Sequence, residues 1–446
     1  MRVGERDERA MRATFVHTAD NHLGYEQYGS RERFDDFAKA FIAVVTDAID
    51  RKADFFVVSG DLFNKRAIDA QTLIQAREAL QMLANAGITA IGIEGNHDRS
   101  YYRDGVSWLQ FLAYLGVLKL LSPIMNDGAP ELTEWSPATM QGLYVPLMDG
   151  RIRVYGLPWY GASTARVMRG LAETLAAGRA EEDAAGVEYR VLLMHTGVEG
   201  ILPQLQELPT RADFEPLRGL VDYVALGHVH KPYDLENWLY NPGSTETWGA
   251  EESAWDRGYY VTQVDTDVAE GEPKHHAEHV TNPRRPFVRY SFRVDGLSDP
   301  ASFYEHFERL TRQQAREHAD LLDRRAVVDV ALTGVFAFDG SAIERPRLEE
   351  IVKEQFHPLI ARIHDSARSN AYEVDGPDGD DEHADRQALE LHVFEELLAR
   401  DARYQPQASE WASTLSAMKR MALDGEQPEQ IAQALRDARA RLLKQN

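Results

Sequence analysis

Five short segments rich in Asp, Asn and His, each directly after an apolar run, constrain this chain more than any other feature. The runs, such as ATFVHT and DFFVVS, are rich in β-branched and aromatic residues and predict buried strands. Because parallel strands end at one edge of a sheet, where α/β proteins bind ligands, we expect the five segments to converge there. In chain order they are Asp20-Asn21-His22, Gly60-Asp61, Gly95-Asn96-His97-Asp98, His195 and Gly227-His228-Val229-His230.

The donor types in these segments indicate a dinuclear metal hydrolase. Carboxylate, amide and imidazole ligands without thiolates suit Mn²⁺, Fe or Zn. Two cations can activate water and neutralise charge on a phosphoryl group, and Asp61 is the expected bridge between them. We expect Asp20, His22 and His230 to complete one metal site, and Asn96, His195 and His228 to complete the other.

Other polar residues near these segments receive supporting or structural interpretations. His97 directly follows a ligand, so its ring is expected to protonate the leaving oxygen or to stabilise charge. Asp98 is expected either to hold the second ring nitrogen of His97 or to cap the local turn. His17 lies inside the first strand and is expected in the core or behind the ligands. A polar stretch further on contains three histidines that are expected at the solvated surface: His275, His276 and His279.

Composition excludes several other kinds of chemistry. The chain of 446 residues has no cysteine, which excludes disulfides, zinc fingers and thiol catalysis. No secretory signal is visible before Met11, which could be an alternative start to Met1, and no apolar run reaches the roughly 18 residues of a membrane span. Net charge is −23 and only nine of 49 basic residues are lysine. We interpret this as adaptation to a high-salt cytoplasm; an acidic protein that avoids polyanions is the alternative.

The chain is long enough for two or three domains. Alternating strand-like and helix-like segments over 12–262 predict parallel βαβ units, with helices near 31–52 and 70–86. The polar stretch 263–283 is interpreted as a boundary. The remaining expectations are a small α+β domain over 285–366 (strands 287–294 and 326–332, helix 345–363), an acidic linker over 375–385, and a helix-loop-helix over 409–444.

Six strings of this chain closely resemble motifs of a known family: HTADNHLGYEQYG, VVSGDLFN, IEGNHDRSYY, LLMHTGV, ALGHVHKPY and NPGSTETW. The family is that of the archaeal DNA double-strand-break repair nucleases of the meiotic-recombination-eleven and SbcD type, within the calcineurin-like metallophosphoesterases. The resemblance covers about 12–250 densely and 285–366 more faintly. It implies an α/β fold, a β-sandwich flanked by helices with a capping domain and a C-terminal helical pair. It also implies two Mn²⁺ ions per chain, with endonuclease and 3′→5′ exonuclease activity.

The resemblance further implies how the chain assembles. A homodimer would form through helices matching about 70–86 and 105–116, and the domain over 285–366 would cap DNA above the metals. The helical pair would bind a coiled-coil ABC-type ATPase. The complex would be cytoplasmic, associated with the nucleoid, and would not bind a membrane. Candidate phosphate contacts in and before the capping domain are Arg284, Arg285, Arg289 and Arg293.

One departure from the family matters. Many relatives have a histidine after GDLF, whereas this chain has Asn64, which cannot supply a titrating proton near neutral pH. We interpret Asn64 as a supporting or DNA-positioning residue. Two other functions stay open. A phosphomonoesterase of the same superfamily would hydrolyse monoesters and ignore DNA, and a mainly architectural DNA-tethering subunit would have weak nuclease activity.

Overall fold

A computed structural model describes residues 10–100, 105–205, 207–269, 271–369, 404–423 and 428–442, together with Leu391, Phe394, Glu395, Leu398 and Glu426. The chain divides into two compact units, Met1–Val335 with Ser341–Arg368, and Phe336–Gly340 with Ser369–Asn446. The expected acidic linker at 375–385 and the residues before 10 lie outside the described residues.

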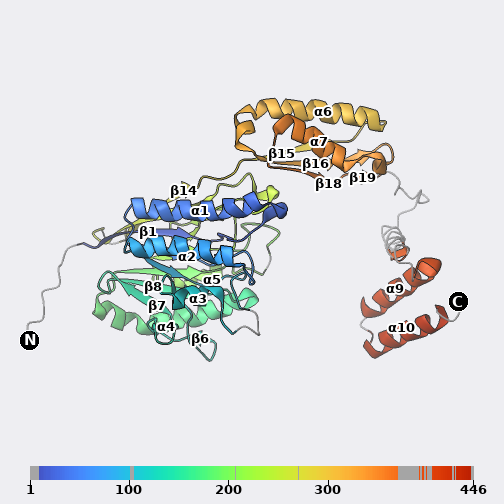
Figure 1. Ribbon diagram of the computed structural model, residues 1–446. Coiled ribbons are helices and arrows are strands. Elements are labelled where there is room, and N and C mark those ends of the chain that lie inside the picture. The colour runs from blue at the N-terminus through green and yellow to red at the C-terminus, as the bar shows by residue number, and fades with distance from the viewer. Residues whose placement is uncertain are drawn as a thin grey trace, which may run out of the picture. The chain divides into compact units, whose positions relative to one another are not determined.

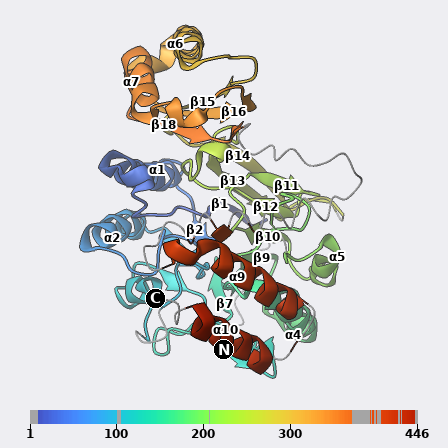
Figure 2. The ribbon, with the colours of Figure 1, turned by 90° about the vertical axis from the view of Figure 1, so that its right-hand side faces the viewer.

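Within the described part of the first unit, two six-stranded mixed sheets pack face to face (Figure 1 and Figure 2). In the first sheet, β1, β2, β3 and β4 are parallel, and β13 and β14 continue it as antiparallel strands. Its order is β14 (His275–Thr281), β13 (Gly258–Asp265), β1 (Arg12–Thr18), β2 (Phe55–Val58), β3 (Thr89–Gly92) and β4 (Lys119–Leu120).

The second sheet has a parallel centre and two antiparallel edge strands, β11 and β7. Side chains of both sheets, including Phe15, Phe55 and Val191, form one buried apolar cluster between them. The order of this sheet is β11 (Tyr233–Leu235), β12 (Leu239–Asn241), β10 (Tyr223–Leu226), β9 (Tyr189–Met194), β8 (Ile152–Leu157) and β7 (Tyr144–Leu147).

Helices cover the outer faces of both sheets, so the predicted β-sandwich flanked by helices is confirmed. On the first sheet lie α1 (Arg31–Asp50), α2 (Ala70–Asn85) and α3 (Trp108–Tyr114), and on the second α4 (Thr164–Ala185) and α5 (Arg211–Phe214). The helical spacing that predicted α1 places Phe34, Phe37, Phe41 and Val45 in the core. Short strands β5 (Met125–Asn126) and β6 (Ala129–Pro130) form a separate pair.

The α+β region contains a three-stranded parallel sheet, β15 (Phe287–Arg293), β16 (Val327–Thr333) and β18 (Ile360–Asp365). Side chains along β15 alternate between buried and exposed, and the strand predicted over 287–294 is confirmed. The predicted helix over 345–363 is wrong in its second half, because α7 (Arg345–Phe356) ends at His357, which has a left-handed φ of 45°. Pro358 follows and cannot continue a helix, so the chain enters β18 instead. The other helix is α6 (Pro300–Glu317), and short strands β17 (Val335–Phe336) and β19 (Arg368–Ser369) follow.

The polar stretch 263–283, interpreted as a boundary, contains β14, so that interpretation is wrong. β14 pairs antiparallel with β13, with Thr281 opposite Gly258 and His275 opposite Val264, and forms the edge of the first sheet. It is an edge strand whose side chains are alternately exposed, which explains its polar composition.

The second unit contains α9 (Ala408–Leu423) and α10 (Pro428–Leu442), which confirms the two predicted helices. Trp411, Ala412 and Leu442 are buried within it. Among the described residues, no helix has the length and apolar character needed to span a bilayer.

Candidate metal centre

All five Asp, Asn and His segments lie at the carboxyl ends of strands, as predicted. The expectation of a single sheet edge is corrected, because the donors come from both sheets. Asp20 and His22 follow β1, Asp61 follows β2, and Asn96 and His97 follow β3 of the first sheet. His195 follows β9, and His228 and His230 follow β10 of the second sheet.

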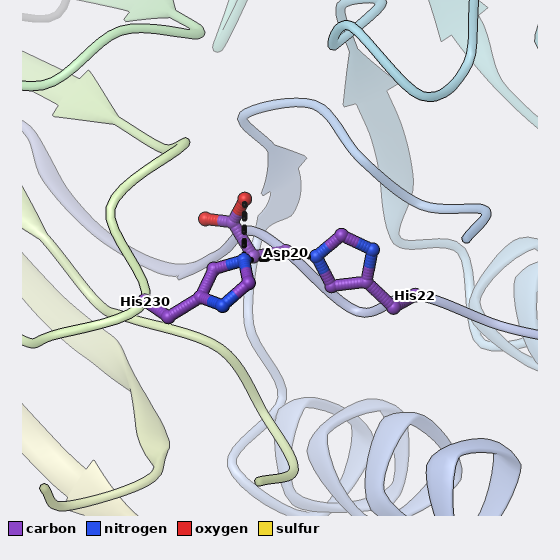
Figure 3. A group of neighbouring side chains, drawn as sticks. All are labelled: Asp20, His22 and His230. Atoms are coloured by element: carbon purple, nitrogen blue, oxygen red, sulfur yellow. Dashed lines mark hydrogen bonds and ion pairs between the residues drawn. The ribbon is translucent and has the colours of Figure 1, made fainter. Parts of the chain in front are cut away.

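The first donor cluster joins Asp20, His22 and His230, whose ligand atoms lie within 4.8 Å of one another (Figure 3). The two Nε2 atoms of His22 and His230 are 3.0 Å apart, and Nε2 of His230 is 4.0 Å from Asp20 Oδ1. Burial lowers the pKa of His22 well below its usual value, so its ring is neutral. Buried imidazole nitrogens that face each other beside a carboxylate fit a cation as their common partner.

The second cluster centres on the amide of Asn96. Its Oδ1 lies 3.1 Å from Nε2 of His195 and 3.0 Å from Nδ1 of His228. Nε2 of His195 is also 3.3 Å from Asp61 Oδ2. Asp61 belongs to one candidate group with Asp20 and His195 and to another with His22 and His97, which is the position expected of a bridging carboxylate.

Bonds outside the centre fix the direction of two ligand rings. Nδ1 of His195 donates to the carbonyl of Ser59 at 2.7 Å, and Nδ1 of His230 lies 2.8 Å from Glu252 Oε1. Both rings therefore present Nε2 to the centre, an arrangement typical of metal-binding histidines. Arg257 in turn holds Glu252 at 3.2 Å. Glu252 is not among the predicted residues, because it lies in the stretch GAEESAW, where no local signal separates it from surface acids.

Four candidate ligands have a left-handed backbone that residues with a Cβ rarely adopt. The φ angles are 51° for Asp20, 49° for His22, 49° for Asp61 and 81° for His228. Each such residue costs about 1–3 kcal/mol, and this strain persists only where surrounding contacts hold it. Here Asp20 N–H donates to the Gly60 carbonyl at 3.1 Å, and His228 N–H donates to Asp20 Oδ2 at 2.9 Å.

Two motif glycines allow the loops to approach closely. A Cβ on Gly95 would lie 2.0 Å from Asp61 Oδ1, and a Cβ on Gly60 would lie 2.3 Å from Nδ1 of His195. Gly60 also has a φ of 89°. The glycines of the G-D and G-N-H-D segments are therefore needed for the donors to meet.

Charges in the centre are strongly coupled to one another. Burial raises the pKa of Asp20 to about 6, although His195 and His230 oppose that change. Burial would also raise the pKa of Asp61, but its ion pair with His195 holds it well below the usual value. Burial lowers the pKa of His195, and Asp61 more than compensates, so that the value is about 9. A cation bound here would displace protons from these groups.

His97 lies against the same centre. Its backbone N–H donates to Asp61 Oδ1 at 2.9 Å, and its Nδ1 donates to the Asn64 carbonyl at 2.5 Å. Asp98 does not hold this ring, so that interpretation is wrong. It accepts backbone N–H groups of Phe63 and Gly95 at 2.9 and 3.0 Å, which confirms the alternative that it caps the local turn.

Two groups of histidines outside the ligand set can now be placed. His17 is fully buried, bonds the Tyr223 hydroxyl at 3.0 Å, and burial lowers its pKa to about 3, so the core interpretation is confirmed. The surface interpretation holds only for His276. His275 is half-buried 3.0 Å from the Tyr240 hydroxyl, and His279 donates to the Pro242 carbonyl at 3.0 Å.

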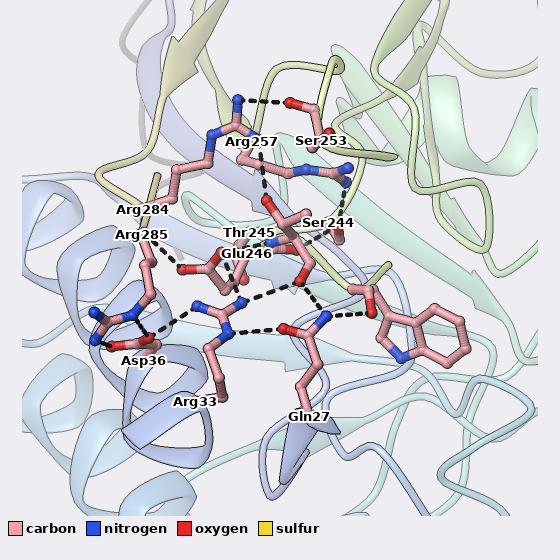
Figure 4. A network of polar contacts seen from close by, with 12 residues as sticks. Gln27, Arg33, Asp36, Ser244, Thr245, Glu246, Ser253, Arg257, Arg284 and Arg285 are labelled. Carbon is pink, nitrogen blue, oxygen red and sulfur yellow. Dashed lines mark hydrogen bonds and ion pairs between the residues drawn. The ribbon is translucent and has the colours of Figure 1, made fainter. Parts of the chain in front are cut away.

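The four candidate DNA-binding arginines all have partners within the protein, and their role stays a prediction. Arg285 binds Asp36 through both carboxylate oxygens (Figure 4), and Arg284 donates to Thr247 Oγ1 at 3.0 Å. The other two form ion pairs, Arg289 with Asp329 at 3.2 Å and Arg293 with Asp295 at 2.8 Å.

The sandwich fold and the paired donor clusters define a phosphoesterase of the calcineurin-like class, and residues 13–232 match the family model for calcineurin-like phosphoesterases. The chain is 31% identical to the DNA double-strand break repair protein Mre11 of Haloferax volcanii over 353 residues. This stretch covers 78% of this chain and 67% of that protein. The chain therefore belongs to the Mre11 family.

Two more relatives carry the same name. Identity to the protein of Archaeoglobus fulgidus is 29% over 249 residues, covering 54% of this chain and 52% of that protein. Identity to the protein of Halobacterium salinarum is 28% over 397 residues, covering 88% of this chain and 87% of that protein. The chain thus spans about half the length of some relatives and most of the length of others.

Proposed function

We propose that the chain is a metal-dependent DNA nuclease, with endonuclease and 3′→5′ exonuclease activity, that acts in double-strand-break repair. The observation that carries the proposal is the pair of donor clusters that share Asp61, with the ring of His97 beside them. Its relatives are named as DNA double-strand break repair proteins, which favours DNA as the substrate.

Divalent cations, in our proposal two Mn²⁺, would be held by the two clusters with Asp61 between them. When bound, they supply an activated water and neutralise charge on the phosphate. Asn96 contributes a neutral carbonyl, which limits the negative charge that a phosphate meets. Asp20 and Asp61 supply the anionic oxygens that a hard or borderline cation prefers.

His97 is proposed to deliver a proton to the leaving oxygen. Since Nδ1 donates to the Asn64 carbonyl, Nε2 is the ring atom left for this transfer. The backbone bond to Asp61 keeps the ring next to the phosphate site. Positioned general acids contribute about 10²–10⁴-fold to rate, so His97→Ala should lower kcat by that factor while metal affinity persists.

The test is cleavage of plasmid and end-labelled linear DNA with Mn²⁺ in molar KCl, with EDTA and His97→Ala as comparisons. Cleavage that needs the metal and His97 supports the nuclease. Intact DNA alongside rapid hydrolysis of a phosphomonoester would favour the phosphatase. DNA tethering that survives in His97→Ala, with only trace cleavage by the wild type, would favour the architectural role.

A homodimer is part of the proposal. Of the apolar side chains on the two helices expected at its interface, Leu80, Leu83 and Leu112 are buried in the core of the protomer. Apolar side chains nearby are exposed, with fractions of 52% for Ile74, 38% for Phe111 and 60% for Tyr114. Exposed apolar side chains on α2 and α3 favour contact with a second copy. Light scattering should give a dimer for the wild type and a monomer for Phe111→Glu.

The remaining domains are proposed to bind DNA and the ATPase. The α+β region over 285–366 would cap the substrate, and α9 with α10 would contact a coiled-coil ABC-type ATPase. Leu435 of α10 is 38% exposed, which leaves an apolar position for such a partner. Removal of 404–446 should abolish co-purification of the ATPase and leave metal-dependent cleavage unchanged.

A further inference from the structure

Trp248 lies beside the metal centre and has no role in the mechanism above. Its ring centroid is 5.5 Å from that of His230 and 6.0 Å from that of His22. Tyr25 stacks on it at 5.5 Å with an interplanar angle of 27°. The fully buried side chain of Gln27 donates to the Trp248 carbonyl at 2.6 Å, so the backbone is held as well (Figure 4).

The indole determines how the amide of Asn64 is oriented. Trp248 Nε1–H lies 3.1 Å from Asn64 Oδ1, and an indole nitrogen can only donate. The amide oxygen must therefore face the indole, which leaves the two N–H groups of Nδ2 on the other side. No described group accepts from them, and Asn64 is only partly buried. The amide thus offers an unused donor to whatever enters the site.

The backbone of the same residue places this donor next to the proposed acid. The Asn64 carbonyl accepts from Nδ1 of His97 at 2.5 Å. One residue therefore orients His97 through its backbone and offers an N–H group through its side chain. An amide donor carries no charge, so it neither titrates nor weakens through screening at high salt as an exposed cation does.

We propose that Asn64 binds a non-bridging oxygen of a phosphodiester in the strand being cut, with Trp248 as the positioning residue that keeps Nδ2 turned toward it. This inference rests on the proposed nuclease function and names the group that aligns the strand with His97. Asn64 would therefore bind the substrate, whereas the histidine of many relatives at this position can also transfer a proton.

Three variants separate the donor from its support. Asn64→Ala removes the donor, and Asn64→Asp keeps an acceptor for the indole but replaces the donor with a negative charge. Trp248→Phe retains an aromatic ring and frees the amide to turn. Trp238→Phe is the matched control, because it also loses an indole bond, to the Val221 carbonyl at 3.0 Å, in the core of the second sheet.

The experiment measures KM and kcat on bis(p-nitrophenyl) phosphate and on an oligonucleotide, and the Kd of the oligonucleotide by anisotropy in a His97→Ala background with Mn²⁺. A lost bond to an anion predicts a rise in KM and Kd of about tenfold for Asn64→Ala, more for Asn64→Asp, and less for Trp248→Phe. Calorimetric Mn²⁺ affinity and the Trp238→Phe control should not change.

The double variant gives the sharpest discrimination. If Trp248 acts through Asn64, Trp248→Phe should have no further effect once Asn64 is alanine. Unchanged KM and Kd in Asn64→Ala, or full additivity of the two changes, would overturn the inference. A wild type that cleaves no phosphodiester at all would instead overturn the proposed function.

Discussion

Two buried polar clusters in this protein are built in opposite ways. In the metal centre, Nε2 of His22 faces Nε2 of His230 at 3.0 Å, and two carboxylates share the same space. In the network of Figure 4, Arg33 is fully buried but bonds Asp36 at 2.8 Å and Glu246 at 3.1 Å. The network pairs each of its buried charges with an opposite charge from the chain. The centre contains the Asp61–His195 pair but also brings two histidine nitrogens face to face and a second carboxylate, Asp20, into the same space. The network is complete as a structure, and the metal centre is complete only with a cation.

The network also joins two regions of the first unit. Arg285, at the start of the α+β region, binds Asp36 of α1, and Arg325 binds Glu32 at 2.8 Å. Arg33 additionally donates to the Thr247 carbonyl at 3.1 Å, one residue before Trp248. The complete cluster therefore supports the incomplete one, since it fixes the segment that lies against the ligands.

Removal of a shared ligand should have the largest effect. Asp61→Asn should lower Mn²⁺ affinity by more than about 100-fold and abolish cleavage, because both clusters lose their common carboxylate. In the metal-free protein it also removes the ion pair of Asp61 with His195, so some loss of stability is expected there as well. Calorimetry and urea unfolding in EDTA check both statements. An unchanged Mn²⁺ affinity in Asp61→Asn would contradict the shared position of this carboxylate.

Metal affinity should also depend on pH in a defined direction. Since His195 has a pKa of about 9 beside Asp61, a cation must displace its proton at neutral pH. Affinity should therefore rise from pH 6 to pH 9, with protons released on binding. Calorimetry in two buffers of different ionisation enthalpy counts these protons, and a pH-independent affinity would contradict the description of the site.

A substitution in the network of Figure 4 should lower the stability of the protein whether or not metal is present. Arg33→Met should lower the free energy of unfolding by about 3–5 kcal/mol, because the buried carboxylate of Glu246 would lose its cation and Asp36 would keep only Arg285. Urea unfolding measures this change. The control is Arg12→Met, which breaks an exposed pair with Asp265 and should cost less than about 1 kcal/mol. Equal effects of the two variants would contradict the distinction.

A smaller effect is expected behind the ligands. Glu252→Gln should weaken Mn²⁺ binding about 10–100-fold, because the amide holds Nδ1 of His230 less firmly than the carboxylate does. Glu251→Gln changes the exposed neighbouring acid and serves as the control. Calorimetry gives the Mn²⁺ affinities of the two variants, and their ratio measures how much Glu252 contributes to binding. A ratio near one would contradict the supporting role of Glu252.

Salt should have the smallest effect on stability per residue, because it acts on many surface charges that each contribute little. With a net charge of −23, the isolated protein should lose stability in dilute buffer and recover it in molar KCl. Thermal melts across KCl concentrations measure the effect. A melting temperature that does not respond to salt would contradict the proposed adaptation.

Much of the fold and the donor set could be predicted because both depend on local pattern. Each ligand segment follows a strand whose apolar residues are visible in the sequence, and Phe34, Phe37 and Phe41 follow helical spacing. The division of donors between two sheets could not be predicted, since it depends on pairing across long stretches of chain. Glu252 and the bond between Trp248 and Asn64 come from similarly distant contacts. Pro358 is a local signal in the sequence for the end of α7.

The most direct test of the central claim is a calorimetric titration of the metal-free protein with Mn²⁺ in molar KCl, followed by a thermal melt. The incomplete centre predicts two ions per chain and a melting temperature that rises with free Mn²⁺, because the ions bind only the folded state. Binding of no ion, or a melting temperature unchanged by saturating Mn²⁺, would contradict the claim that this cluster is built around cations.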